Sequence, residues 1–134
     1  MKVIPKTRGR DSQGAGYYGA SRGSRKHNGI DFVAEAGERV CAFVGGTITK
    51  LGYAYSDDLS YRYIELVDAS GMYCRYFYVE PLCNVGDIIA NGETIGRAQD
   101  IAARYQGITP HYHFEVFEGA KHYVNPYAYL SGDA

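Results

Sequence analysis

The pattern that most constrains this chain begins at Gly29, where short runs of β-branched and aromatic residues start to alternate with glycine-containing turns. Such runs are typical of β-strands, and glycine supplies the backbone angles that tight turns need. The expected strands cover residues 30–34, 39–43, 46–53, 61–67, 72–79, 87–89, 93–97 and 112–117. One helical turn is expected over residues 100–105, and Asn91-Gly92 predicts a hairpin. The sequence therefore predicts an all-β domain built on a compact antiparallel β-sheet.

The segment before this pattern, residues 1–26, is rich in glycine, serine and basic side chains. We expect it to be a loop-rich part of the same domain, because 134 residues fit a single domain over residues 1–134. Its basic residues gather at positions 6–10 and 22–26. These clusters are interpreted as solvated loops, with a basic rim that attracts an anionic polymer such as a bacterial cell wall as the alternative.

Charge and cysteine content exclude several classes of protein. The formal net charge of −1 provides no electrostatic footprint for nucleic acid, and no segment has the apolar length of a membrane span. We expect synthesis in the cytoplasm without a signal peptide, because the first residues contain no apolar stretch of that kind. Cys41, Cys74 and Cys83, an odd number without CxxC spacing, predict free thiols, the first two as small buried hydrophobes.

The first of two histidine motifs is the run from His27 to Asp31, which leads into an expected strand. The strand would fix Asp31, and His27 can fold back over it. Gly29 permits the close approach or unusual backbone angle that this requires. Imidazole nitrogen and carboxylate oxygen are both ordinary zinc ligands.

The second motif is His111-Tyr112-His113. Side chains on a strand repeat every two residues, so both histidines face the same side while Tyr112 packs on the other. One histidine can then bind a metal while its neighbour reaches a metal-bound water. His122 lies outside both motifs and is interpreted as a surface residue.

A site with two nitrogen donors and one oxygen donor, from His27, Asp31 and His113, matches a catalytic zinc ion rather than a structural one. Structural sites close with four protein ligands and usually include cysteine, whereas none of the cysteines lies in either motif. We therefore expect one zinc ion with a position open to water or substrate.

These motifs resemble those of the lysostaphin-type zinc endopeptidases, metallopeptidase family 23, over about residues 14–130. The resemblance is carried by residues 25–31, 36–40, 46–48, 85–87, 93–96 and 110–116. It implies a compact β-sheet fold with a groove, one zinc ion, and hydrolysis of peptide bonds in bacterial peptidoglycan. It also implies that His27, Asp31 and His113 bind the metal, that His111 is the base or positions the water, and that Glu115 supports the ligands.

One position departs from the family pattern: Tyr78 stands where active members carry a further histidine, as it does in the chemotaxin-like branch of the family. A tyrosine, with a reference pKa of about 10, can donate a hydrogen bond to an oxyanion but is no ordinary base at neutral pH. The alternative is a tyrosine that packs beside the metal without a catalytic role.

Two functions remain open on this reasoning. The first is a peptidoglycan hydrolase that acts at the cell wall after release or delivery, as a bacteriophage lysis or virion protein or with other delivery-machinery proteins. The second, suggested by Tyr78, is a zinc-containing binding module with weak or absent catalytic activity.

Overall fold

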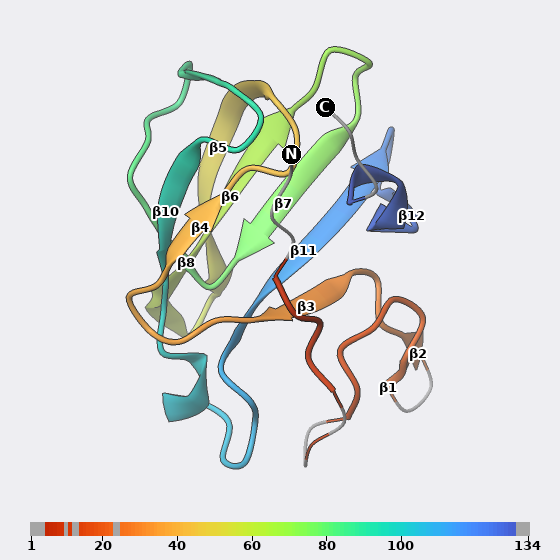
Figure 1. Cartoon of the computed structure of the whole chain (residues 1–134), viewed down its shortest axis with the longest axis vertical. Coiled ribbons are helices and arrows are strands. Elements are labelled where there is room, and N and C mark those ends of the chain that lie inside the picture. Colours follow the sequence, from red (N-terminus) through yellow and green to blue (C-terminus); the bar gives the residue numbers. More distant parts are fainter. Residues whose placement is uncertain (1–4, 10, 12–13, 23–24, 131–134) are drawn as a thin grey trace.

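The computed structural model describes residues 5–9, 11, 14–22 and 25–130, and its regular secondary structure consists almost entirely of antiparallel strands (Figure 1). The strands are β1 (Ser21–Arg22), β2 (Arg25–Lys26), β3 (Ile30–Val33), β4 (Arg39–Cys41), β5 (Gly46–Tyr55), β6 (Asp58–Val67), β7 (Tyr73–Phe77), β8 (Val79–Pro81), β9 (Ile88–Ile89), β10 (Thr94–Ala98), β11 (His111–Glu118) and β12 (His122–Val124). Two short 3-10 helices complete the chain, η1 (Ile101–Ala103) and η2 (Pro126–Tyr129). The predicted all-β antiparallel class is confirmed.

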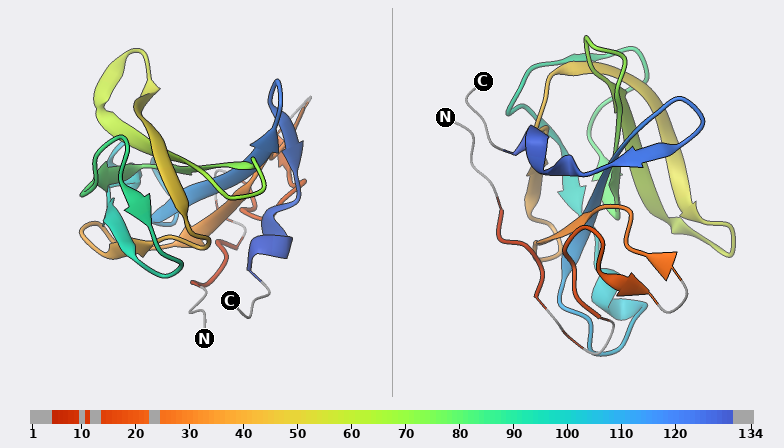
Figure 2. Two further views of the ribbon diagram at one scale, coloured as in Figure 1. Left: turned by 90° about the horizontal axis from the view of Figure 1, so that it is seen from above. Right: turned by 90° about the vertical axis from the view of Figure 1, so that its right-hand side faces the viewer.

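The largest sheet has the strand order β12-β11-β7-β6-β5-β9, and β3 pairs with β11 beside it. A smaller sheet has the order β4-β10-β8, and β1 pairs with β2. The register of β5 against β6 shifts twice, which increases the local twist, and the view from above in Figure 2 shows the large sheet curled.

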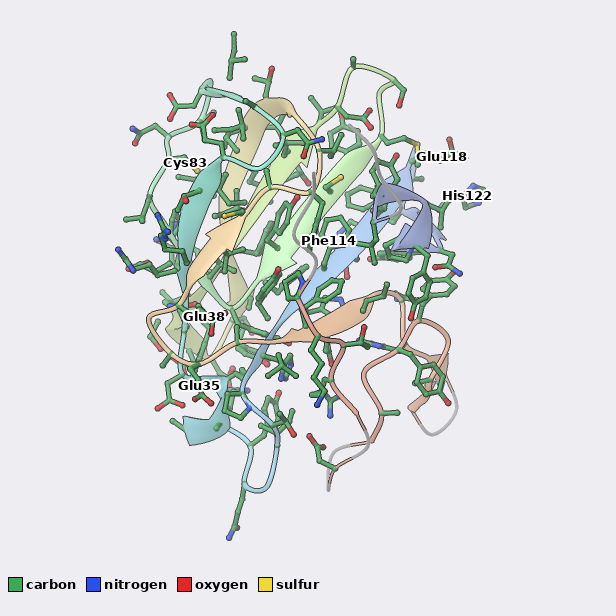
Figure 3. All side chains as sticks on the ribbon, viewed as in Figure 1. Glu35, Glu38, Cys83, Phe114, Glu118 and His122 are labelled. Atoms are coloured by element: carbon green, nitrogen blue, oxygen red, sulfur yellow. The ribbon has the colours of Figure 1, made fainter. Side chains whose placement is uncertain are left out.

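The hydrophobic core includes strand residues of both sheets. Val40 and Ile95 come from the small sheet, and Ile64 and Leu66 come from β6 of the large one. Phe114 on β11 lies at the centre of the molecule, as Figure 3 shows, and none of its surface is exposed. Because β11 is anchored here by apolar packing, the polar residues earlier in the same strand are held in fixed positions.

Several predicted elements differ from the structure. The expected strand over residues 72–79 breaks into β7 and β8 at Tyr78, whose φ of 67° lies in the left-handed region and interrupts the extended backbone. The hairpin predicted at Asn91-Gly92 is wrong. A turn is present there, but β9 pairs with β5 while β10 pairs with β4 and β8. The sequence pattern also missed β12 and η2.

The loop-rich N-terminal segment adds to the edge of β3. Thr7 forms an isolated bridge with Phe32, and the Arg8 backbone N–H donates to the Asp31 carbonyl over 2.7 Å. Arg8 is only 2% exposed, so its interpretation as part of a solvated cluster is wrong. Of the two basic clusters, position 10 and positions 23–24 lie outside the described residues.

The structure shows free thiols at all three cysteines, as predicted. Cys74 and Cys83 are buried, but Cys41 is exposed, because it lies on the outward face of the short strand β4. Among the described residues, we find no helix with the length and apolar character needed to cross a membrane.

Candidate metal centre

Three donor atoms from separate positions in the chain meet at one point. Asp31 Oδ1 lies 2.8 Å from His113 Nδ1 and 3.3 Å from His27 Nε2, and the two histidine nitrogens are 3.0 Å apart. Ligands about 2.0–2.2 Å from a tetrahedral zinc ion lie about 3.3 Å from each other. The three separations come within about half an ångström of that value, so the donors fit a small tetrahedral cation.

Strand register brings these donors together. Asp31 on β3 and His113 on β11 are directly opposed in the antiparallel pair. His27 reaches them from the loop before β3, and its ring lies 4.8 Å from the His113 ring. At Gly29, between His27 and Asp31, an added Cβ would lie 2.8 Å from a His113 ring carbon and closer still to the Phe114 carbonyl oxygen. Only glycine allows this loop to lie against β11.

The second nitrogen of each histidine ligand is also held. His27 Nδ1 lies 3.0 Å from the Tyr17 carbonyl oxygen, and His113 Nε2 lies 2.9 Å from Glu115 Oε1. With a metal bound, these two oxygens would keep the ring protons on those nitrogens and leave the lone pairs of His27 Nε2 and His113 Nδ1 facing the shared point. Partners of this kind fix the orientation of metal-binding histidines.

The electrostatics of the cluster favour an ionised carboxylate. Burial alone would raise the pKa of Asp31, but hydrogen bonds from His113 and His27 outweigh it and hold the pKa well below its usual range. For His113, burial opposes the charged form, yet the hydrogen bonds to Asp31 and Glu115 raise its pKa to about 9. Without a metal, His113 is therefore an imidazolium between two carboxylates.

His111 lies beside the three donors. Its Nδ1 lies 2.8 Å from the Thr109 carbonyl oxygen, and its Nε2 lies 3.6 Å from Asp31 Oδ2. The carbonyl assigns the proton to Nδ1, so Nε2 carries the lone pair. Burial lowers the pKa of His111, only partly opposed by the charge of Asp31, so the ring is neutral at pH 7.

Tyr78 faces the same site. Its ring lies 5.7 Å from the His111 ring, edge to face, and it stacks on Tyr55 at 6.0 Å. The Tyr105 hydroxyl donates to the Tyr55 hydroxyl over 2.9 Å, and Tyr55 in turn donates to Tyr78 over 3.3 Å. Burial raises the pKa of Tyr78 to about 12, so its hydroxyl stays protonated at neutral pH.

These side chains line one cavity of about 490 Å³. Its lining includes the three donors, His111 and Glu115, together with Tyr78, Tyr105 and apolar residues in and after η1. A cavity of this size with a few convergent polar groups is typical of a small-ligand or substrate site. It is large enough for a short stretch of peptide.

All six residues singled out in the sequence, His27, Asp31, His113, His111, Tyr78 and Glu115, lie around this cavity. Their chemical roles stay predictions. The other predicted features also have clear positions: Tyr112 packs in the core, and His122 on β12 is exposed and projects outward, as Figure 3 shows.

Sequence reasoning missed Arg8, Tyr55 and Tyr105. Arg8 donates to the carboxylate of Asp31, and the two tyrosines support the Tyr78 hydroxyl. For Tyr55 and Tyr105, the signal in the sequence was the high tyrosine content, 14 of 134 residues. Arg8 gave no such signal because it sits among exposed-looking basic residues.

Comparisons with known proteins agree with this geometry. The model of peptidase family M23 matches residues 25–126. Mouse leukocyte cell-derived chemotaxin-2 is 30% identical over 120 residues, which cover 90% of this chain and 76% of that protein. The two sequences therefore correspond along nearly the whole of this chain.

Solved structures show the same fold. The catalytic domain of the antimicrobial peptidase lysostaphin from Staphylococcus simulans superposes with a TM-score of 0.66 at 24% identity, covering 91% of this chain and 92% of that one. LytU superposes with a TM-score of 0.71 at 21% identity, covering 97% and 88%. Together with the match over residues 25–126, this shows that the chain belongs to peptidase family M23.

Proposed function

We propose that this protein is a zinc metalloendopeptidase that hydrolyses peptide bonds in bacterial peptidoglycan. The observation that carries the proposal is a site with three protein donors, His27, Asp31 and His113, at the wall of a cavity that also holds a neutral histidine. Three protein donors leave a position for water or substrate, as in catalytic zinc sites. Membership of family M23 and the resemblance to lysostaphin support peptidoglycan as the substrate class.

Each residue of the site has a chemical task on this proposal. His27 Nε2, Asp31 Oδ1 and His113 Nδ1 would hold zinc, which supplies a Lewis acid that polarises a carbonyl and acidifies water. His111 accepts a proton at Nε2, because its Nδ1 proton is engaged by the Thr109 carbonyl. A neutral imidazole in this position suits general base catalysis near pH 7.

Tyr78 supplies the hydrogen-bond donor for the developing oxyanion. Its hydroxyl oxygen accepts from Tyr55, which leaves its own hydrogen to donate to a group bound in the cavity that it lines. The tyrosine ring is fixed by the left-handed backbone at this position and by stacking on Tyr55. A donor held in place before the reaction is worth about 10²–10³ in rate in other hydrolases.

Purified cell walls test this function directly. The zinc-loaded protein is expected to release new amino termini, and His111→Ala is expected to lose about 10²–10⁴ of the rate with its zinc content unchanged. Tyr78→Phe is expected to lose about 10²–10³, because the ring remains and only the donor is removed. Failure of the wild-type protein to release amino termini faster than His111→Ala would overturn the proposal.

Tyr78 also supports a second candidate function, a zinc-containing binding module without hydrolytic activity. The similarity to leukocyte cell-derived chemotaxin-2 gives this alternative its weight. It predicts wall or glycan binding that persists in His111→Ala, with hydrolysis appearing only in Tyr78→His. Specific cleavage by the unmodified chain would exclude it.

We also propose that the enzyme is made in the cytoplasm and acts at the cell wall after release or delivery, in bacteriophage lysis or as a virion protein. The free thiols support synthesis in a reducing compartment. Genes for a holin or for tail proteins beside this one, together with detection of the protein in purified virions or lysates, would test the setting. A gene neighbourhood without phage functions would count against it.

A further inference from the structure

Arg8 is the largest fully buried side chain in the described part of the molecule, and it lies at the metal centre. Its Nε and Nη2 both donate to Asp31 Oδ2, over 3.0 and 2.9 Å. Its Nη1 pairs with Asp11 Oδ1 at 2.9 Å and donates to the Gly14 carbonyl over 2.8 Å. A buried guanidinium with this many satisfied donors has one fixed orientation.

Backbone hydrogen bonds also hold the Arg8 segment against Asp31. The Arg8 N–H donates to the Asp31 carbonyl over 2.7 Å, and the Asp31 N–H donates to the Gly16 carbonyl over 2.8 Å. An added Cβ at Gly16 would lie 2.7 Å from Arg8 Cβ and 3.0 Å from Asp31 Cβ, so the three residues are in close contact. Figure 2 shows this N-terminal segment running alongside β3.

The two oxygens of Asp31 therefore have separate partners. Oδ1 faces His113 and His27, at 2.8 and 3.3 Å, while Oδ2 accepts both hydrogen bonds from the guanidinium and lies 3.6 Å from His111 Nε2. A carboxylate with both oxygens available can bind a metal through one oxygen or through two. Here the second oxygen is engaged by a charged, bidentate donor pair.

We propose that Arg8 is a positioning residue that makes Asp31 a single-oxygen ligand and so keeps the metal four-coordinate with one open position. The inference rests on the zinc site of the proposed function, but it does not depend on which bond the protein cuts. Its consequence is that affinity and coordination number are set in part by the N-terminal segment, outside the histidine motifs.

A purely structural role for Arg8 makes a different prediction. A buried ion pair that only stabilises the fold would change the free energy of unfolding and leave the metal spectrum of the folded protein unaltered. A positioning role alters the coordination of the metal in a protein that is still folded. The spectrum of a bound transition metal separates the two.

The test compares the full chain with Arg8→Met and Arg8→Lys, with Arg97→Met as the control for loss of one positive charge at an exposed site. Zinc affinity is measured by competition with a chelator, and Co²⁺ replaces zinc for visible absorption. We expect Arg8→Met, which removes both donors to Asp31, to bind zinc about 10–100-fold more weakly. Arg8→Lys should bind about tenfold more weakly, because a single ammonium group cannot reproduce the two parallel hydrogen bonds of the guanidinium. The Co²⁺ bands of both should weaken as Asp31 gains a second metal contact.

Unchanged affinity and unchanged Co²⁺ bands in folded Arg8 variants would overturn the inference. If both variants fail to fold, Asp11→Asn replaces them as the test, because it weakens the ion pair that holds Arg8 and leaves Asp31 unchanged. This variant should weaken zinc binding to a smaller extent. No change in that variant would also overturn it. A wild-type protein that binds zinc but cleaves no wall refutes the proposed function alone, whereas one that binds neither zinc nor Co²⁺ refutes both.

Discussion

Zinc at the proposed site would have to compete with a proton for His113, and this competition gives a quantitative prediction. His113 lies between Asp31 and Glu115, at 2.8 and 2.9 Å, and these hydrogen bonds raise its pKa to about 9 against the opposing effect of burial. A histidine binds a metal only as the neutral ring, so zinc binding has to release this proton.

The magnitude follows from the distance between the working pH and that pKa. At pH 7 the metal-free ring is about two pH units below its pKa, so roughly 1% of it is neutral. Zinc affinity at pH 7 should therefore be about 100-fold below its value above pH 9, equivalent to about 2.7 kcal/mol. Because the pKa of His113 is raised, the proton occupies the ring below pH 9 and opposes the metal. Zinc affinity should therefore rise about tenfold per pH unit between pH 7 and 9.

Chelator competition at several pH values measures how steeply zinc affinity rises with pH. Calorimetry in two buffers of different ionisation enthalpy counts the protons released on binding at pH 7, and we expect about one. Glu115→Gln is the matched variant, since it removes one of the two charges that raise the pKa and should move the end of the rise to lower pH. Affinity that stays level from pH 7 to 9, or binding without proton release, would refute the reasoning.

Three further outcomes test the packing of the site and of the fold that carries it. Gly29→Ala should destabilise the protein by about 1–3 kcal/mol in urea unfolding and weaken zinc binding, because the new methyl group displaces His113. Gly9→Ala, which meets no atom within 4 Å, should change stability by less than about 0.5 kcal/mol. Tyr76→Phe should cost about 1–3 kcal/mol, because it removes the acceptor of a buried backbone N–H between β4 and β5. A thiol reagent should label one cysteine, Cys41, in the native protein and three after denaturation; labelling of buried thiols at the same rate would contradict the packing.

Local patterns in the sequence predicted most strands and the grouping of the three candidate donors, because both depend on short spacing. His113 and His111 fall on one face of β11 by strand alternation alone, and the glycine in the first motif indicated a loop that folds back. The predictions that failed depend on contacts between residues far apart in the chain. The turn at Asn91-Gly92 has hairpin chemistry, yet its flanking strands find partners elsewhere, because pairing is decided by long-range packing.

Two features of the site could not be predicted for the same reason. Tyr78 adopts a left-handed backbone conformation that nothing in its own sequence favours, and only the structure shows the resulting break between β7 and β8. Arg8 is far from Asp31 in the chain and carries a charge, so composition places it at the surface. Its burial becomes favourable only when Asp31 and Asp11 neutralise it.

The opposed positions of Asp31 and His113 on β3 and β11 have a consequence for how the chain reaches this structure. A slip of one residue between the strands would turn Asp31 and His113 to opposite faces of the sheet. The strand β3 has only four residues, so it has few contacts of its own with which to reject such a slip. Zinc would bind only the correctly aligned pair, and at a free concentration 100 times its Kd would favour it by about 2.7 kcal/mol. The ion proposed for the reaction would thus also select the strand alignment during assembly.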